Sequence, residues 1–413
     1  MVSKRSSLLW AVCLILTLFP AAAIASDIFE RLRSVTLQPI DETALPSAVV
    51  APDGAHAYFG TTVWPTRIVK VDLLNLQRVG SLVIGSTDNP ITTAMISPDG
   101  RYGYFGSDTP NGTLTRVDLE TFTTAGSVSL PGLGGVLSGV MSPDGNHAYI
   151  GTSSSPAHVV MIDLVSMQVV ESLAMQEGIN RLSSAAITPD GKHAFFGTET
   201  SPASIVRVEL TTLKEYDAFT AKGGEMVLRT AVMSPNEPFV YFASGDSPSR
   251  ILKVGVERFE QMDTLLLQEG PGPGFPGEDM VRSSAITPDG RFAYFGTHTV
   301  TARVVKVDLE KFERVGALTL PNDEAFLRSG DVSPDGSRVY FGTGGSPGRV
   351  VEIRVDQILP EEARAIGDLD NNGCLDFRDF VLVLELWGFF IDGTPIGFQE
   401  FLALLEHWRA RGC

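Results

Sequence analysis

The amino-acid sequence predicts a mainly β protein: a closed ring of seven small antiparallel sheets, followed by a small all-α module at the C-terminus. Three observations lead to this prediction. A turn motif related to Ser/Thr-Pro-Asp-Gly recurs at nearly constant spacing, each period holds four strand-like segments, and the pattern changes after residue 356 to an acidic loop and helical stretches. With 43% hydrophobic and 20% charged residues among 413, the chain is too apolar to be disordered.

The charge of the chain limits its partners. The formal net charge is −17, which argues against nucleic acid as the main partner because phosphate binding needs a basic surface. No second long apolar run follows the first one, so a multispan membrane protein is also excluded. The composition leaves proteins, glycans and small ligands as partners.

Residues 1–25 have the layout of a secretory signal peptide. Lys4 and Arg5 precede an apolar run from Leu8 to Ala25, which ends in a small-x-small site before Ser26. The alternative is an uncleaved anchor helix, since the run is just long enough to span a bilayer. We expect cleavage, no membrane span afterwards, and a secreted protein, either extracellular, at the cell surface or in the periplasm.

The repeat organises the next domain, which we place at residues 26–356. Its turn prolines are 46, 45, 46, 46, 53 and 46 residues apart. Near-equal periods of this length indicate an array of small sheets. The seven prolines are Pro52, Pro98, Pro143, Pro189, Pro235, Pro288 and Pro334.

One period reads as four antiparallel strands. They are expected at Ser47–Ala51, His56–Thr61, Arg67–Leu73 and Arg78–Ile84. A Pro-Asp-Gly turn joins the first two, because Pro presets φ, Asp hydrogen-bonds the local backbone and Gly accepts a positive φ. Four strands in about 45 residues are typical of a propeller blade.

The two ends of the repeat predict how the ring closes. Arg33–Leu37 matches the fourth strand of a period, whereas the last period, Arg328–Val355, holds only three strands. The N-terminal strand should therefore complete the seventh blade. Such a three-plus-one closure removes the free edges of the ring.

The repeat resembles a known group of proteins. The phrases SPDGRYGYFG and RVVKVDLEKFERVGALTL are similar to YVTN-type bacterial β-propeller repeats and their lactonase-like relatives. The resemblance implies a seven-bladed β-propeller, which we expect to be monomeric. It does not fix a function, because such propellers include enzymes, surface-layer proteins and ligand binders.

One face of the ring carries a candidate ligand-binding site. Arg229, Arg282 and Arg328 each lie six residues before a turn proline, and an acid lies four residues before each of them: Glu225, Glu278 and Glu324. The arginines could form a ring of cations that binds a carboxylate, a phosphate or an acidic sugar. Alternatively, each acid could pair with its arginine and only stiffen a loop. Trp64, in a loop of the first period, is a further candidate, either stacking on a sugar or simply packed.

The ring shows no pattern typical of a catalyst. No His and Cys cluster with metal-ligand spacing occurs in it, and it has no Gly-x-Ser-x-Gly nucleophile motif. Three histidines share one repeat position, His56, His147 and His193, which is typical of packing or surface residues. Catalytic residues are therefore assigned to none, although a pair of acids that hydrolyses a glycoside or lactone stays open.

The tail carries a calcium-loop pattern. After a linker at residues 357–365, the module at 366–413 begins with oxygen-bearing residues at alternate positions and a Gly at the sixth, Gly373. Calcium requires six or more oxygen ligands from a sharply turning loop. The predicted ligands of a single calcium ion are Asp368, Asp370, Asn372, Cys374 through its backbone carbonyl, Asp376 and Asp379.

The tail resembles a type I dockerin, an EF-hand-related module. Helices are expected at Phe380–Trp387 and Phe398–Arg409, and a second loop ending at Glu400 has lost its ligand pattern, so one ion is expected. The resemblance implies a cohesin-type partner on a scaffold or cell surface. Cys374 and Cys413 are a candidate disulfide, with the free thiols as the alternative.

These observations favour a secreted, non-catalytic propeller that binds a ligand and is attached through its calcium-dependent tail. Whether the chain is an enzyme stays open. The first alternative is a lactonase-like or polysaccharide-degrading enzyme targeted by the same tail. The second is a structural surface protein in which the tail only seals the end of the chain.

Overall fold

The recurring turns join the first two strands of each sheet. In the second repeat, the N–H of Gly100 donates to the carbonyl of Ser97 (2.8 Å), and the Asp99 carboxylate accepts from the Ser97 hydroxyl (2.5 Å) and from the N–H of Arg101 (3.0 Å). Gly100 has a φ of +72°, a conformation that other residues adopt at a cost. The turn is therefore closed by its own side chains, which explains why its residues recur.

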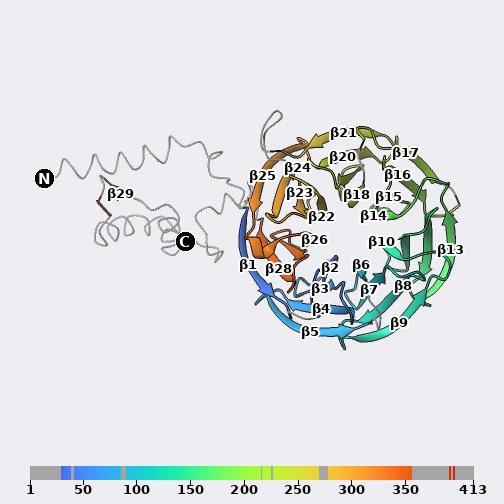
Figure 1. The fold of residues 1–413 in the computed structure, drawn as a ribbon, viewed down its shortest axis with the longest axis horizontal. Coiled ribbons are helices and arrows are strands. Elements are labelled where there is room, and N and C mark those ends of the chain that lie inside the picture. The colour runs from blue at the N-terminus through green and yellow to red at the C-terminus, as the bar shows by residue number, and fades with distance from the viewer. Residues whose placement is uncertain are drawn as a thin grey trace, which may run out of the picture. The chain divides into compact units, whose positions relative to one another are not determined.

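The computed structural model describes residues 29–38, 41–84, 90–214, 216–224, 227–268 and 278–355, together with 390–391 and 394–395. The large unit, Phe29–Val355, is a seven-bladed β-propeller, as predicted (Figure 1). Each blade is a four-stranded antiparallel sheet, whose strands run in order from the central axis to the rim.

The strands of the blades have closely similar lengths. The innermost strands are β2 (Ser47–Val50), β6 (Ile91–Ile96), β10 (Val136–Met141), β14 (Leu182–Ile187), β18 (Leu228–Met233), β22 (Val281–Ile286) and β26 (Leu327–Val332). The second strands are β3 (His56–Gly60), β7 (Tyr102–Ser107), β11 (His147–Thr152), β15 (His193–Thr198), β19 (Phe239–Ser244), β23 (Phe292–Thr297) and β27 (Arg338–Thr343). The third strands are β4 (Arg67–Asp72), β8 (Thr113–Asp118), β12 (His158–Asp163), β16 (Ser204–Glu209), β20 (Arg250–Gly255), β24 (Arg303–Asp308) and β28 (Arg349–Arg354).

The outermost strands form the rim of the ring. They are β5 (Gln77–Val83), β9 (Thr123–Ser129), β13 (Gln168–Ala174), β17 (Tyr216–Thr220), β21 (Gln261–Leu266), β25 (Glu313–Thr319) and β1 (Glu30–Thr36). A single turn of 3₁₀ helix, Asn322–Glu324, precedes the seventh blade. In the C-terminal unit, two short strands pair, β29 (Phe390–Ile391) with β30 (Thr394–Pro395).

The core lies between the blades. In the described residues, an apolar cluster fills the interface between each blade and the next. In most blades, a glycine at or next to the end of the second strand permits this close packing. At Gly197, an added Cβ would lie 2.5 Å from the Ser184 hydroxyl and 2.7 Å from Cβ of Leu228 in the next blade. A methyl group there would force the two blades apart.

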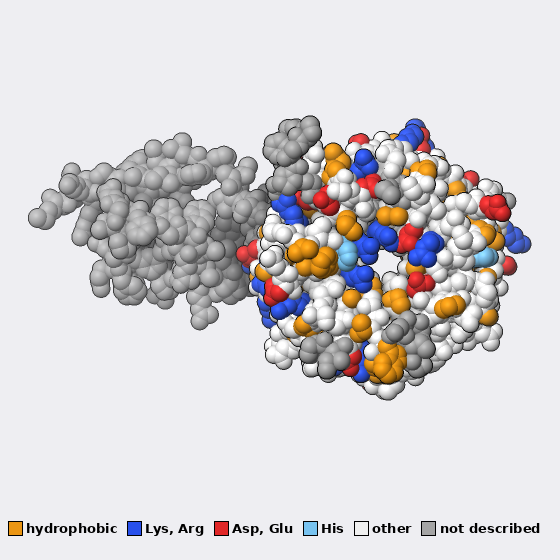
Figure 2. Space-filling model, in the orientation of Figure 1, with side chains coloured by type: hydrophobic (Ala, Val, Ile, Leu, Met, Phe, Trp, Pro, Cys, Tyr) orange, Lys and Arg blue, Asp and Glu red, His pale blue; other side chains and the backbone are white. Residues whose placement is uncertain are grey.

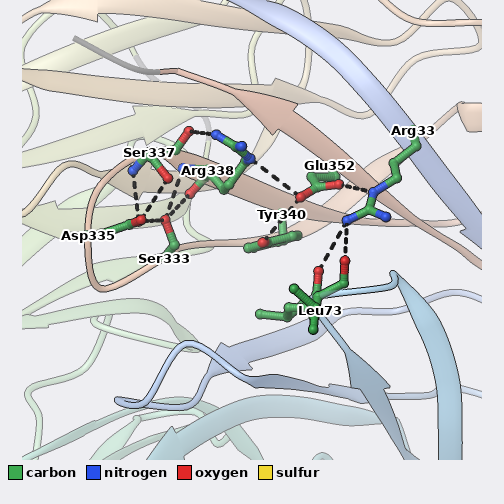
Figure 3. A network of polar contacts seen from close by, with 9 residues as sticks. Arg33, Leu73, Ser333, Asp335, Ser337, Arg338, Tyr340 and Glu352 are labelled. Atoms are coloured by element: carbon green, nitrogen blue, oxygen red, sulfur yellow. Dashed lines mark hydrogen bonds and ion pairs between the residues drawn. The ribbon is translucent and has the colours of Figure 1, made fainter. Parts of the chain in front are cut away.

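The ring closes in the predicted three-plus-one manner. The seventh sheet has the order β1-β28-β27-β26, so the N-terminal strand pairs with the last strand of the ring. Figure 3 shows how side chains secure this junction: Arg33 of β1 forms an ion pair with Glu352 of β28 and donates to the carbonyl of Leu73 in the first blade (3.2 Å). Glu352 is almost fully buried and also lies 3.5 Å from Arg338.

The predicted signal peptide, linker, tail helices and calcium loop lie outside the described residues. The described pair β29–β30 falls within the second, ligand-poor loop of the tail. No helix of the described residues is long and apolar enough to cross a membrane.

Candidate functional site

A β-bulge at the start of the innermost strands positions the arginine side chains. The register between the first two strands of the blade shifts between Leu228 and Thr230, so Arg229 is the extra residue. Arg282 and Arg328 occupy the same bulged position in blades 6 and 7. A bulge redirects the side chain of its extra residue. The three arginines therefore leave their strands in the same way, at the same end of the ring.

The backbone around these arginines is fixed between neighbouring blades. The N–H of His298 donates to the carbonyl of Met280 in its own blade (2.9 Å), and the N–H of Phe326 in the next blade donates to the carbonyl of Thr299 (2.9 Å). Met280 and Phe326, each two residues before an arginine, have φ values of +54° and +60°. Ala44 and Arg181, at the same position of blades 1 and 4, are also left-handed, so this strained conformation belongs to the repeat. The spacing between Arg282 and Arg328 is thus set by hydrogen-bonded backbone.

The acids that precede two of the arginines pair with other partners. Glu278 binds Arg314 of β25, with its Oε1 2.9 Å from Nε, and Glu324 binds Arg31 of β1. Both carboxylates are 1% exposed. The structure therefore does not form the loop-stiffening pairs Glu278/Arg282 and Glu324/Arg328. Glu225 lies outside the described residues.

The same acid–arginine pair recurs in the first blade, which shows that it is part of the repeat. Glu42 accepts from Nε (2.7 Å) and Nη2 (2.6 Å) of Arg78 on the outermost strand. Burial raises the pKa of Glu42, but the hydrogen bonds from Arg78 and from the N–H of Gln38 outweigh it, and the net shift is downward. These pairs tie the start of the innermost strand to the rim of the blade.

The arginines of the channel mouth are left with little counter-charge. Among the described residues, neither Arg282 nor Arg328 has a hydrogen bond or an ion pair. Arg229 and Arg181 share one carboxylate, that of Glu199, which lies 2.7 Å from Nε of Arg181. We call Arg181, Arg229, Arg282 and Arg328 the arginine arc. It spans blades 4 to 7.

Burial and mutual repulsion act on the arginine arc. Burial lowers the pKa of Arg229 to about 10, and Arg282, Arg181 and Arg328 add to the effect through their positive charge. Contact with Glu199 opposes this shift. The pKa values of Arg282 and Arg328 are lowered as well, first by burial. Like charges that converge in a partly buried site make it a candidate functional site.

His298 lies within the same cluster. Burial lowers its pKa to about 4, and the charges of Arg282 and Arg328 contribute. Its ring packs on Phe326, with 5.2 Å between the centroids, and its Nδ1 is buried without a hydrogen bond. At neutral pH the imidazole is uncharged and adds nothing to the positive charge of the arc.

The mouth of the channel is polarised. Figure 2 shows basic side chains gathered beside the central opening of the ring, with a histidine and acidic side chains among them. The bulged position holds an arginine only in blades 5 to 7. In blades 1 to 4 the residues six before the turn proline are Pro46, Thr92, Leu137 and Ser183. Trp64 is 59% exposed, in the loop between β3 and β4 of the first blade and outside the arc.

A carboxyl group at the junction of the last and first blades departs from the repeat. Asp331 of β26 accepts from the N–H of Val50 in the first blade (2.7 Å) and from the N–H of Val332 (2.9 Å). Burial raises its pKa to about 6. The other six blades have an apolar residue here: Val49, Met95, Val140, Ala186, Val232 and Ala285.

Sequence analysis selected three arginines of the arc and missed the importance of Glu199, His298 and Asp331. The signal that could have found them is deviation from the repeat. His298 and Glu199 both lie ten residues after a turn proline, a position held elsewhere by Thr62, Asp108, Ser153, Gly245 and Gly344. In a repeated fold, residues that differ from those at the same position of the other blades are the first candidates for a site.

The predicted calcium ligands, Asp368, Asp370, Asn372, Cys374, Asp376 and Asp379, lie outside the described residues, as do both cysteines of the candidate disulfide, Cys374 and Cys413. Within the part of the chain that the structure describes, no three His, Cys, Asp or Glu side chains are grouped to hold a metal ion.

Comparisons with known proteins support the fold. No protein-family model matches the chain, and no curated protein matches it. Among solved structures, it is similar to hydrazine synthase of Kuenenia stuttgartiensis, with a TM-score of 0.65 and 16% sequence identity. The match covers 78% of this chain and 99% of that one. At this identity the likeness concerns the fold alone.

Proposed function

We propose that this chain is a secreted, non-catalytic binding protein, whose propeller holds an anionic ligand at the arginine arc and whose tail attaches it to a cohesin-type partner. One observation carries the proposal for the propeller. Arg282 and Arg328 stand at the channel mouth on fixed backbone, with no carboxylate partner among the described residues. In a chain of net charge −17, a local cluster of cations without counter-charge lowers the stability of the fold through mutual repulsion. Binding of an anion would remove this repulsion.

Binding accounts for the cluster better than stability does. The repeat already satisfies its buried acids with the rim arginines Arg31, Arg78 and Arg314. The arc therefore adds no counter-ion that the fold requires. Its guanidinium groups supply planar, multiple donors that match carboxylate, sulfate or phosphate oxygens.

The non-catalytic role rests on the chemistry that the cluster offers. Its members are four arginines, one carboxylate that two of them neutralise, and an imidazole whose pKa is lowered to about 4. Charge complementarity is what this set provides best, because such an imidazole is a weak base at neutral pH.

A second function is favoured by one specific observation. Glu199 lies beside Arg181 and Arg229, and His298 lies beside Arg282 and Arg328. Two unlike groups in one arc suit an enzyme acting on an acidic sugar or lactone. In that case the arginines would stabilise a substrate carboxylate, while His298 or Glu199 moves a proton. Ligand binding would raise the pKa of His298 by adding negative charge beside it.

The proposals for the two ends of the chain come from its residues. Secretion is inferred from the layout of residues 1–25, and attachment from the calcium-loop pattern at 368–379. Calcium would organise the tail, since its ligands assemble only on folding.

The test uses the full chain and a variant in which Arg229, Arg282 and Arg328 are all changed to Gln. A matched control changes three arginines elsewhere on the propeller: Arg101, Arg258 and Arg354. All three proteins are titrated with acidic and neutral polysaccharides and assayed for cleavage products. Binding of acidic ligands that only the first variant loses supports the binding role, and cleavage lost in the same variant supports the enzyme. Equal binding by all three proteins would refute both.

A pull-down tests the tail separately. The full chain is the bait against secreted and surface proteins of its host, with calcium and then with chelator. Capture of a cohesin-type partner only with calcium supports the proposed attachment. Capture that chelator does not change would refute it.

A further inference from the structure

The arginine arc is divided into two halves with different net charge. In blades 4 and 5, Arg181 and Arg229 share Glu199. In blades 6 and 7, Arg282 and Arg328 have no carboxylate partner among the described residues, and the neighbouring Asp246 is held by Arg250 (2.9 Å). The uncompensated charge of the second half is therefore two.

The two arginines of the second half start from hydrogen-bonded backbone. Both arginines start from bulges in adjacent innermost strands, β22 and β26. The segment His298–Thr299 lies between them and is hydrogen-bonded to both strand starts, through Met280 and Phe326. The backbone of this segment thus links the two strand starts, and the imidazole of His298 adds no third charge.

We propose that Arg282 and Arg328 form a subsite for a dianionic phosphate group, either the free ion or a sugar phosphate monoester; this inference rests on the anion-binding function proposed above. Two neighbouring guanidinium groups offer forked donors to a single acceptor. A tetrahedral group with three terminal oxygens and two charges can accept from both forks at once, whereas a carboxylate shared by two arginines, as at Glu199, brings only two oxygens and one charge. Two charges on the ligand neutralise the two that the fold leaves open.

The rest of the mouth indicates what the phosphate is attached to. In the first three blades, the residues six before the turn proline are Pro46, Thr92 and Leu137. They carry no charge, so the remainder of the ligand should be neutral on that side. A phosphorylated sugar meets this requirement better than a polyanion, whose further charges would find no cation there.

The experiment compares three glucose derivatives that differ in their anionic group: a phosphate, a sulfate and a carboxylate. Glucose 6-phosphate carries two charges at pH 7.5, and glucose 6-sulfate and glucuronate each carry one. Inorganic phosphate is the fourth probe. Each is titrated calorimetrically into the full chain at low ionic strength, because surface electrostatics weaken with salt.

The variants separate the subsite from general charge. Arg282→Gln and Arg328→Gln each remove one fork, Arg282→Lys keeps the charge but removes the fork, and Arg258→Gln removes a charge from an arginine that is 79% exposed. Thermal unfolding of each variant verifies that it folds. The two Gln variants should weaken phosphate binding by roughly 10- to 100-fold, the Lys variant by less, and the control not at all.

Each result decides a different question. Binding of the phosphate ester at least tenfold tighter than that of its sulfate and carboxylate counterparts supports the subsite. Binding of inorganic phosphate alone also supports it and identifies the free ion as ligand. Equal binding of all three sugars overturns the dianion subsite but leaves the anion-binding function standing. Failure of every anion to bind overturns both.

Discussion

Glu278 forms a bidentate ion pair with Arg314, 36 residues later, and not with Arg282, four residues later. This partnership joins the start of an innermost strand to the rim of the same blade. Its equivalents recur in the first and last blades, so the acid belongs to the architecture. The arginine four residues on is thereby released to face the channel mouth.

The first prediction concerns the stability of this pair. Arg314→Met should lower the free energy of unfolding by about 3 kcal/mol, because it leaves a carboxylate buried without its main partner. Arg303, 3.7 Å from the Glu278 carboxylate, compensates for part of the loss. Denaturant unfolding of Arg314→Met, Glu278→Gln and the double variant measures the change in the free energy of unfolding. If the pair is structural, the double variant is less destabilised than the sum of the two single ones.

Repulsion within the arginine arc should lower the stability of the protein, so replacing one of its arginines should raise it. Arg282→Gln is expected to raise the free energy of unfolding by up to about 1 kcal/mol, since it removes repulsion with Arg229 and Arg328. Thermal unfolding without added anions checks this, with Arg258→Gln as control. A variant less stable than the control would contradict a site kept for binding. Added phosphate should narrow the difference by stabilising the unaltered chain.

A pH effect should follow from Asp331. Its pKa is raised in the folded state, from 3.8 to about 6, so the folded chain binds this proton more tightly than the unfolded chain. The contribution of Asp331 to the free energy of unfolding therefore falls as the pH rises from 4 to 6, by about 3 kcal/mol over the whole range. Asp331→Asn removes this dependence.

His298 makes the comparison with Asp331→Asn necessary. Its pKa is lowered, from 6.5 to about 4, so its contribution to stability increases over the same pH range and opposes that of Asp331. Urea unfolding at pH 4 and pH 7 gives the stability of each protein. The difference between Asp331→Asn and the unaltered chain should shift in favour of the variant at pH 7. A difference that does not change with pH would show that the carboxyl has an ordinary pKa in the fold.

The calcium affinity of the tail should depend on single carboxylates of the predicted loop. Asp368→Ala should reduce calcium affinity by at least roughly tenfold, because it removes the first ligand of the predicted loop. Asp392→Ala, in the second loop, should leave it unchanged. Calorimetric titration of the full chain after chelator treatment compares them. Equal losses in both variants would indicate that the second loop also binds calcium.

Much of the fold could be predicted because it is repeated. The turn prolines predicted seven blades, and the surplus strand at Arg33–Leu37 predicted the closure that β1 and β28 form. Local rules suffice here, since in five of the seven blades the turn is closed by its own Ser or Thr hydroxyl and Asp carboxylate. Three arginines of the arc were found for the same reason.

The partners of these residues could not be predicted from the sequence. Glu278 and Arg282 are close in the chain, but a bulge turns the arginine away and burial directs the acid to Arg314. Asp331 was missed because its hydrogen-bond partner, the N–H of Val50, comes from the opposite end of the propeller sequence. Long-range geometry, not residue type, decides both cases.

The pairing of β1 with β28 has a consequence for synthesis. The first strand of the ring to leave the ribosome cannot find its neighbours until the last blade has been made, so the ring stays open while the chain grows. Its contacts span most of the domain, as with Arg31 and Glu324, which are 293 residues apart. Closure of the ring is therefore the last step of folding.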